Sequence, residues 1–338
     1  MPADPVTAGR DIVVIGASAG GVHALRELVE GLTPGLPAVV FVVLHLRPHG
    51  HSALPAILTR SGCLPAVHPT DGEVIQAGRI YVAPPDRHLA IANSHIHLSR
   101  NASENGHRPA IDVLFRTAAK AYGSRVVGVL LTGNLDDGTA GLAAIKRCGG
   151  VAVVQDPREA DYPAMPESAI ANVEIDHILP VQEIGPLLDR LLHEPRPAAL
   201  AEGAADVEEE PDGMGTLKRE IVAGGTEGVE PSGLSCPECG GSLFERPEEQ
   251  PLHFRCRTGH AYSPESLLAR QSDALEAALW AALRSLEENA ALALRMEKRT
   301  RDYGNDRSGQ RYRRRARAVE RHAKVLREIL HHGGTEAE

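Results

Sequence analysis

The sequence predicts an α/β fold with a doubly wound, mostly parallel sheet, followed by a small metal-ribbon-like module and an α-helical hairpin. Five short runs within residues 11–155 are nearly all apolar, as strands covered on both faces are. Stretches with helical spacing separate these runs, which favours parallel strands joined by helices. A cysteine-rich segment and two heptad-like stretches near the C-terminus predict the two smaller parts.

The predicted strands of the main sheet are rich in β-branched residues. They read DIVVI, AVVFVVL, RIYVA, RVVGVLL and VAVVQ, at residues 11–15, 38–44, 79–83, 125–131 and 151–155. One predicted helix follows the first strand, and another follows Asp112, which is placed to cap it. Residues 87–99 alternate around Asn93-Ser94, so we expect a short hairpin at the sheet edge.

Composition limits the classes of protein to which the chain can belong. It has 338 residues, 42% of them apolar, and a net charge of −9, which argues against a nucleic-acid binder. The five cysteines are odd in number, and three of them crowd near the C-terminus, which argues against a disulfide framework. No signal peptide is visible, and the longest apolar run is too short to span a bilayer. We therefore expect a cytoplasmic protein without membrane insertion.

Changes in composition divide the chain into four parts. We expect an α/β domain over 1–192, a flexible acidic linker over 193–233, a ribbon-like module over 234–263 and an antiparallel helical hairpin over 264–332. The acidic run of the linker could also serve as a docking tail. In the hairpin, apolar stripes recur in heptad-like steps, and the residues are Leu275, Leu279, Ala282, Leu286 and Ala290, then Tyr312, Ala316, Val319, Ala323, Leu326 and Leu330.

The loop GASAG at residues 16–20 admits two interpretations, a phosphate cradle or a turn that presents a nucleophilic serine. A dinucleotide-binding loop needs glycine where this chain has Ser18, because a side chain there obstructs the pyrophosphate. It also needs a carboxylate at the end of the second strand, where this chain has His45. The nucleotide interpretation therefore fails at two independent positions.

The nucleophile interpretation requires a base and an acid at neighbouring strand ends. Ser18 ends the first strand before a helix, and the backbone N–H of Ala19 is placed as an oxyanion donor. His45 follows the second strand, and Asp137 follows a later strand, so a Ser-His-Asp triad is possible. Alternatives remain at this point, because other polar residues also lie near strand ends. They are His49, His51, His88 and Asp136, and Asp137-Gly138 could be only a turn.

Several motifs in series resemble the catalytic domain of CheB-type chemotaxis receptor methylesterases. They are VVIGASAGG, VVLHLRP, GRIYVAPPDRHL, HRPAIDVLF, GVLLTGNLDDGTAGL and AVVQDP followed by YPAMPESAI, and they run from residue 11 to about 188. The resemblance implies a cofactor-independent hydrolase that removes methyl groups from receptor glutamates and can deamidate receptor glutamines. It implies Ser18 as nucleophile, His45 as base and Asp137 as orienting acid, with Asp136 an exposed neighbour.

The chain departs from the best-known members of this family in three places. Ala19 replaces a threonine after the nucleophile, and Asn134-Leu135 replaces Met-Gly before the acidic pair, which bears on substrate preference. Only about ten residues precede the first strand, so we expect a standalone form without the receiver domain. Control by phosphorylation of a fused domain is then not expected.

The cysteine-rich segment has the spacing of a structural metal site. Cys236 and Cys239 form a C-x-x-C knuckle, and Cys256 and His260 supply two further ligands. Three cysteines and one histidine are typical of closed tetrahedral zinc sites, and a segment this short needs such a staple. The alternatives are a redox pair of Cys236 and Cys239, or iron as the metal.

The second helix of the hairpin is rich in arginine. These arginines could form a surface for nucleic acid or anionic lipid, or they could pair with acidic residues of the preceding helix. They are Arg311, Arg313, Arg314, Arg315, Arg317 and Arg321. The hairpin could also bind a protein partner. The alternatives to a receptor methylesterase are therefore an adaptor that binds through this tail, or an esterase that acts on another substrate.

Overall fold

The computed structural model describes residues 9–46, 52–194, 230–245 and 252–332. The chain divides into two compact units, Met1–Leu267 and Leu268–Glu338. No helix within the described ranges is long and apolar enough to cross a membrane.

A seven-stranded sheet forms the centre of the first unit, in the order β3-β4-β2-β1-β7-β8-β9. Its strands are β1 (Ile12–Ala17), β2 (Val39–Leu44), β3 (Ala66–Val67), β4 (Ile80–Val82), β7 (Val126–Leu130), β8 (Val151–Gln155) and β9 (His177–Leu179). Every neighbouring pair is parallel, so the predicted doubly wound sheet is confirmed. The edge strands β3 and β9 were not predicted, because their sequences, AV and HIL, are not part of a longer apolar run.

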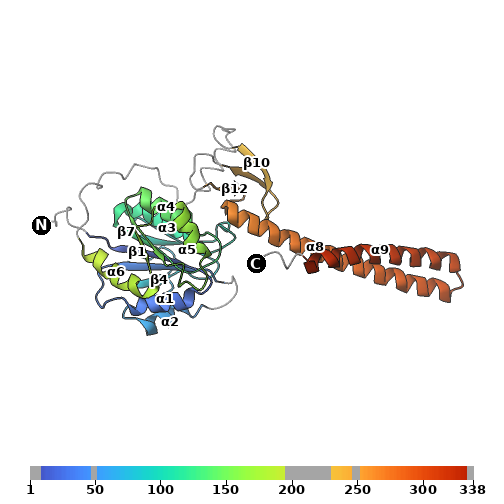
Figure 1. Cartoon of the computed structure of the whole chain (residues 1–338), viewed down its shortest axis with the longest axis horizontal. Helices are drawn as coiled ribbons and strands as arrows, with labels where there is room; N and C mark the ends of the chain where they lie inside the picture. Colours follow the sequence, from blue (N-terminus) through green and yellow to red (C-terminus); the bar gives the residue numbers. More distant parts are fainter. Residues whose placement is uncertain (1–8, 47–51, 195–229, 246–251, 333–338) are drawn as a thin grey trace. The chain divides into compact units, whose positions relative to one another are not determined.

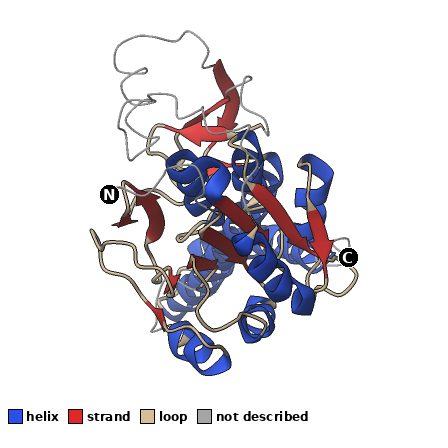
Figure 2. Ribbon diagram, turned by 90° about the vertical axis from the view of Figure 1, so that its left-hand side faces the viewer, coloured by secondary structure: helices blue, strands red, loops and turns tan. Residues whose placement is uncertain are grey.

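Helices cover both faces of this sheet (Figures 1 and 2). They are α1 (Gly21–Glu30), α2 (Leu54–Ser61), α3 (Ile111–Tyr122), α4 (Thr139–Arg147), α5 (Ala164–Asn172) and α6 (Val181–His193), with a short 3-10 turn at Gly123–Arg125. Alternate strand residues point to opposite faces: Val13 and Ile15 pack with α1, α2 and α6, whereas Val14 packs with α3, α4 and α5. Strands β1, β2, β7 and β8 are therefore buried on both sides, which explains their continuous apolar sequences.

The strand order reverses at β1. The chain leaves β1 for β2 on one side, and later returns to β7 on the other side. Ligands of open α/β sheets bind outside the carboxyl ends of the strands at such a switch point. This edge of the sheet is therefore where the polar residues at the strand ends should meet.

The predicted hairpin exists, but it is not part of the main sheet. Strands β5 (His88–Ala92) and β6 (His95–Ser99) form a separate two-stranded sheet. Asn93 and Ser94 have φ angles of 50° and 61°, as a two-residue type I′ turn requires. One face of the hairpin packs into the core beside α3. Burial of this face accounts for the alternation of apolar and polar residues, and the hairpin does not pair with an edge strand of the main sheet.

The first unit ends in a four-stranded antiparallel sheet around the cysteine-rich segment. Its strands are β10 (Glu230–Ser235), β11 (Ser242–Glu245), β12 (Phe254–Cys256) and β13 (Ala261–Tyr262). A small core joins Leu243, Phe254 and Tyr262 to the cysteines. Strand β10 begins within the span assigned to the linker, and most of that predicted linker lies outside the described residues.

Two long helices form the second unit, although α8 begins in the first unit. Helix α8 (Pro264–Asp302) and helix α9 (Asp306–His332) are joined by a short turn at Gly304, whose φ is 74°. The predicted helical hairpin is confirmed, and Arg327 of α9 pairs with Glu287 of α8. Part of the predicted stripe on α8 was wrong, because Leu275 is 62% exposed. The buried residues of α8 in this unit instead include Leu283 and Ala293, and α9, with 27 residues, is too short to cover all 39 residues of α8.

Candidate active site and metal centre

Ser18, His45 and Asp137 lie at the carboxyl edge of the main sheet, around the switch point. Ser18 directly follows β1, His45 directly follows β2, and Asp137 lies in the loop after β7. Oγ of Ser18 is 3.1 Å from Nδ1 of His45, and Nε2 of His45 is 2.7 Å from Oδ2 of Asp137. The structure thus brings the three residues into one chain of hydrogen bonds.

The partners of the imidazole define its tautomer. An ionised carboxylate only accepts hydrogen bonds, so Nε2 of His45 carries the proton that it donates to Asp137. Nδ1 is then unprotonated and accepts from the hydroxyl of Ser18. This arrangement gives Ser18 a base within direct reach of its proton.

Asp137 is buried, yet its surroundings favour the charged form. Burial opposes ionisation, but hydrogen bonds from His45 and from the N–H of Ile111 hold the pKa of Asp137 well below its ordinary value. Oδ1 of Asp137 also accepts a hydrogen bond from Nδ2 of Asn105, at 3.0 Å. The side chain of Asp137 therefore remains an acceptor at neutral pH, as the tautomer of His45 requires.

The loop around Ser18 is held close to its neighbours. The N–H of Ser18 donates to the carbonyl of Thr132, which joins the loop to the end of β7. Gly20 has a φ of 74°, a left-handed conformation that glycine adopts without strain. A side chain at Gly133 would meet Cβ of Ser18 at 2.8 Å, so only glycine fits beside the hydroxyl. Within the described part of the chain, no acceptor is recorded for the N–H of Ala19, so this group is available to an oxyanion.

Asp112 caps a helix other than the one predicted. Helix α3 begins at Ile111 after Ala110, and Asp112 lies in its first turn. Oδ1 of Asp112 accepts from the N–H groups of Gly138 and Gly141, at the start of α4. The expected cap of α3 was therefore wrong, because the carboxylate satisfies the free N–H groups of the neighbouring helix. Burial and the nearby charge of Asp137 raise the pKa of Asp112.

The alternative residues considered from the sequence have other surroundings. Asp136 is not the exposed neighbour that was expected: it is 8% exposed and accepts a hydrogen bond from Oγ of Ser266. His88 is buried away from Ser18, between the carbonyl of Ala102 and the N–H of Ala110. His49 and His51 lie outside the described residues.

Two residues next to the site were not among the candidates identified from the sequence. Asn105 is 1% exposed and donates from Nδ2 to both Asp137 and Asp112. The ring of His107 stacks on that of His45, with 3.7 Å between ring centroids and 8° between ring planes. His107 begins the motif HRPAIDVLF that carries the family resemblance, but neither this motif nor Asn105 was linked to a role in the site.

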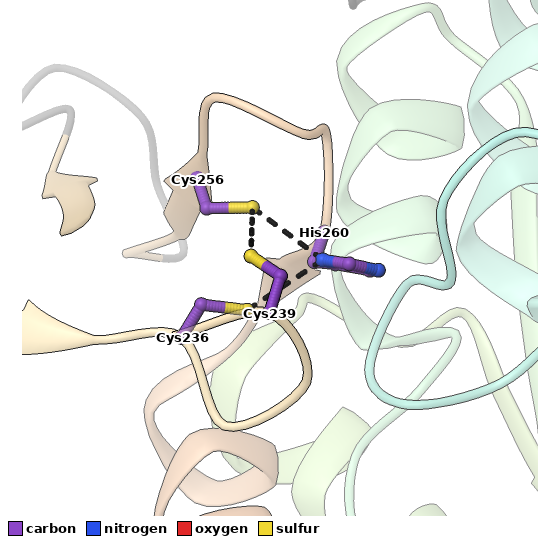
Figure 3. A group of neighbouring side chains, drawn as sticks. All are labelled: Cys236, Cys239, Cys256 and His260. Carbon is purple, nitrogen blue, oxygen red and sulfur yellow. Dashed lines mark hydrogen bonds between the residues drawn. The ribbon is translucent and has the colours of Figure 1, made fainter. Parts of the chain in front are cut away.

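Cys236, Cys239, Cys256 and His260 converge in the C-terminal part of the first unit (Figure 3). The sulfurs of Cys236 and Cys256 lie 3.6 Å and 3.5 Å from Nδ1 of His260. The sulfurs of Cys239 and Cys256 are 3.7 Å apart. All five cysteines of the chain are described and free, so Cys236 and Cys239 form no disulfide in this structure.

These distances fit a tetrahedral zinc ion. With Zn–S near 2.3 Å and Zn–N near 2.0 Å, the edges of a tetrahedron are about 3.8 Å between sulfurs and about 3.5 Å between sulfur and nitrogen. Each cysteine half also forms a tight turn, since the N–H of Gly240 donates to the carbonyl of Cys236, and the N–H of Gly259 donates to that of Cys256. The backbone thus places four ligand atoms around one point.

Neighbouring groups favour the thiolate form of Cys239 and orient the imidazole of His260. Burial opposes ionisation of Cys239, but hydrogen bonds from Thr258, Gly241 and His260 lower the pKa of this thiol to about 6. Nε2 of His260 lies 3.2 Å from Oε2 of Glu238, the carboxylate contact that often orients a metal-binding histidine. A thiolate and an oriented imidazole are the ligand forms that zinc binds.

A second group of potential ligands does not suit a metal. Glu104, Asp112 and His253 lie close together. However, both carboxylate oxygens of Glu104 accept from the guanidinium of Arg116, at 2.6 Å and 2.8 Å. This group is therefore better described as a partly buried ion pair of Glu104 and Arg116 beside the site.

Comparisons with known proteins agree with the geometry of the first unit. Residues 13–188 match the model of the family described as CheB methylesterase. A Leptospira interrogans protein, provisionally named a protein-glutamate methylesterase/protein-glutamine glutaminase, is 37% identical over 182 residues, or 54% of this chain and 94% of that protein. "Protein-glutamate methylesterase/protein-glutamine glutaminase 2" of Anaeromyxobacter dehalogenans is 38% identical over 54% of each chain.

A solved structure gives the same result for the fold. The crystal structure of the Thermotoga maritima CheB methylesterase catalytic domain is similar with a TM-score of 0.52 and 34% identity. The match covers 98% of that chain and 54% of this one. The family model ends at residue 188, so the metal centre and the helical hairpin lie beyond it.

Proposed function

The chain belongs to the CheB methylesterase family, and we propose that it hydrolyses glutamate methyl esters on chemotaxis-type receptors and releases methanol. The observation that carries this proposal is the unbroken chain of hydrogen bonds from Ser18 through His45 to Asp137. The names of the relatives support both methyl ester hydrolysis and the deamidation of glutamine side chains. We extend both activities to this chain, with a cytoplasmic receptor domain as the partner.

The geometry supports a two-step acyl transfer. Nδ1 of His45 takes the proton of Ser18 as Oγ attacks the ester carbonyl, and the N–H of Ala19 donates to the oxyanion. The same nitrogen then protonates the departing methoxide, which leaves as methanol. Water attacks the acyl-enzyme with His45 again as the base, and this step regenerates Ser18 and releases glutamate. With a glutamine side chain, the leaving group is ammonia.

Asp137 contributes through the imidazole and does not itself transfer a proton. Its ionised carboxylate holds the proton on Nε2 and stabilises the imidazolium that forms when Nδ1 accepts the serine proton. The methyl leaving group is small, so recognition must come from contacts with the receptor around the ester. The non-consensus residues Asn134 and Leu135 lie directly before the acidic pair and are our choice for tuning that preference.

We further propose that Cys236, Cys239, Cys256 and His260 hold a structural zinc ion. The ligand distances and the contact of Glu238 with His260 support this assignment. Elemental analysis of protein purified without added metal should give about one zinc per chain. Iron in that amount would identify the other metal, whereas a folded module without metal would contradict the proposal.

The helical hairpin is the second part of the chain to which we assign a partner. Large apolar side chains, among them Leu275, Trp280 and Tyr303, are exposed on it. Such exposure favours binding of another protein over a purely internal role. Replacing Trp280 by Glu should weaken that binding without changing hydrolysis of a small ester.

Methanol release from methylated receptor tests the proposed function. The wild-type protein should release methanol, and Ser18→Ala should release none above the uncatalysed rate. Ser99→Ala is a matched control, since Ser99 lies on the separate hairpin. Equal release by wild type and Ser18→Ala would reject Ser18 as the nucleophile. Labelling of Ser18 by a fluorophosphonate without methanol release would instead indicate an esterase for another substrate.

A further inference from the structure

The cysteine-rich module contacts the loop that supports the acid of the active site. Both parts belong to the first compact unit. The N–H of Ala261 in β13 donates to the carbonyl of Ser103, and the N–H of Asn105 donates to the carbonyl of Ala261 at 2.7 Å. Residues 103–105 thus run beside β13 as a short parallel pairing. The end of the module is attached to this loop by its backbone.

Asn105 connects this attachment to Asp137. Its Oδ1 accepts from the N–H of Ser263 at 2.9 Å, and its Nδ2 donates to Asp137 and Asp112 at 3.0 Å and 3.1 Å. Only one orientation of the amide satisfies all three partners, because Ser263 offers a donor and the two carboxylates offer acceptors. The side chain is buried, so water does not replace these bonds easily.

The metal centre contacts the same loop through Glu238. One carboxylate oxygen of Glu238 lies 3.2 Å from His260, and the other accepts from Oγ of Ser103 at 2.5 Å. The start of α8, which directly follows the module, contacts the acidic pair, where Oγ of Ser266 donates to Asp136 at 2.8 Å. Both ends of the module are therefore bonded to segments that carry or adjoin the site.

We propose that Asn105 is a positioning residue of the esterase, and that the metal-binding module holds Asn105 in place and so sets the activity of Ser18. The proposal rests on the proposed function and on the proposed metal site. The path runs from His260 through Glu238 to the loop at Ser103, then through Asn105 to Asp137 and His45. Asn105 itself touches no reacting atom in this scheme.

Loss of Asn105 should change the activation of Ser18, and not only the stability of the fold. Without Nδ2, Oδ1 of Asp137 loses a donor, so the carboxylate becomes more basic and holds the proton on His45 more strongly. The charged and titratable groups that interact with Asp137 are His45, His88, His107, Asp112 and Arg116. All of these groups remain when Ala replaces Asn105, and among them only Asp112 also loses a hydrogen bond from Nδ2.

The first test compares wild type with Asn105→Ala in the full-length protein. A fluorophosphonate counts the active sites and gives the labelling rate per site, so misfolded molecules do not enter the rate. We expect Asn105→Ala to lower this rate about 10- to 100-fold. We also expect the acid limb of the pH–rate profile to move to higher pH, which a purely structural defect would not cause. An unchanged rate and an unchanged profile would overturn the proposal.

The second test removes one of the proposed metal ligands. Cys239→Ser should lose zinc and lower the labelling rate per site, whereas Cys148→Ser, an exposed cysteine outside the cluster, should match wild type. If Cys239→Ser fails to fold, Ser103→Ala takes its place, because it removes only the contact with Glu238. A wild-type rate in the zinc-free variant would separate the module from catalysis.

A double-mutant cycle then decides whether the two effects share one path. If the module acts through Asn105, the double variant Asn105→Ala/Cys239→Ser should be no slower than the slower single variant. Effects that multiply would show two independent defects and overturn the link. Failure of the proposed function itself has a different signature. Wild type would then not be labelled on Ser18, or it would be labelled there without releasing methanol from methylated receptor.

Discussion

His45 faces Asp137 through Nε2, at 2.7 Å, and faces Ser18 through Nδ1. In the chymotrypsin-type triad the two ring nitrogens have the opposite partners. The chemistry is unchanged, because a base needs only one free nitrogen toward the serine and one N–H toward the acid. The strand order places β2, which His45 follows, and β7, which precedes the loop of Asp137, on opposite sides of β1.

Asp137→Asn should abolish most of the activity. All the recorded partners of this carboxylate are donors, so the NH2 group of asparagine must face at least one of them. If it faces His45, the proton moves to Nδ1 and the base is lost. We expect kcat for methanol release to fall by about a thousandfold or more. Asp136→Asn is the matched control, since it keeps an acceptor for Ser266, and a similar loss there would argue against the assignment of roles.

The pair of Glu104 and Arg116 should stabilise the fold above acidic pH. Burial opposes ionisation of Glu104, but Arg116 lowers its pKa from the ordinary 4.5 to about 2. Because the folded-state pKa is depressed, the stabilisation is complete above pH 4.5 and is lost as the pH falls toward about 2. Because the side chain of Arg116 is 34% exposed, solvent screens part of this interaction. Glu104→Gln should therefore cost about 1–3 kcal/mol of unfolding free energy at neutral pH, and much less near pH 2.

Denaturant unfolding at several pH values measures this effect. Glu30→Gln serves as the control, because Glu30 lies 3.8 Å from Arg26 with both side chains about half exposed. An exposed pair of this kind contributes about 0–1 kcal/mol. A constant difference between Glu104→Gln and wild type from neutral pH to pH 2 would contradict the prediction.

Gly133→Ala should damage the active site directly. The new methyl group would lie 2.8 Å from Cβ of Ser18 and 2.6 Å from the sulfur of Met165, so one of them must move. We expect loss of methanol release together with about 1–3 kcal/mol of destabilisation. Gly309→Ala on α9 is the matched control, where the nearest atom is at 3.4 Å. Full methanol release by Gly133→Ala would contradict the prediction that the close contact between residue 133 and Ser18 requires glycine.

Asp112 should be required for stability through its cap of α4. Asp112→Ala leaves the N–H groups of Gly138 and Gly141 without their acceptor, and we expect a cost of about 1–2 kcal/mol. Asp112→Asn keeps a carbonyl oxygen for the same groups and should cost less. Thermal or denaturant unfolding of both variants measures the difference. Equal stability of Asp112→Ala and wild type would exclude the cap.

The main sheet and the ends of its strands were predictable because their signals are local. A strand buried on both faces must be apolar throughout, so β1, β2, β7 and β8 are visible in the sequence. Parallel strands also align their carboxyl ends, which is why Ser18, His45 and Asp137 could be grouped before their distances were known. The edge strands β3 and β9 are not part of longer apolar runs, so they give no such signal.

Contacts between distant segments could not be predicted in the same way. The cap of α4 by Asp112 and the bond from Ser263 to Asn105 join residues far apart in the chain, and their sequences contain no periodicity that specifies a partner. Helical spacing likewise identified an apolar stripe on α8 but not which of its residues α9 covers. Packing in three dimensions decides these pairings.

Mass-spectrometric mapping of a fluorophosphonate adduct tests the central claim most directly. The full-length protein should carry one adduct per chain, on Oγ of Ser18, with labelling strongly slowed in His45→Ala. Ser18→Ala should carry none. An adduct on another residue, or equal labelling of wild type and His45→Ala, would contradict the account that His45 activates Ser18 as the nucleophile.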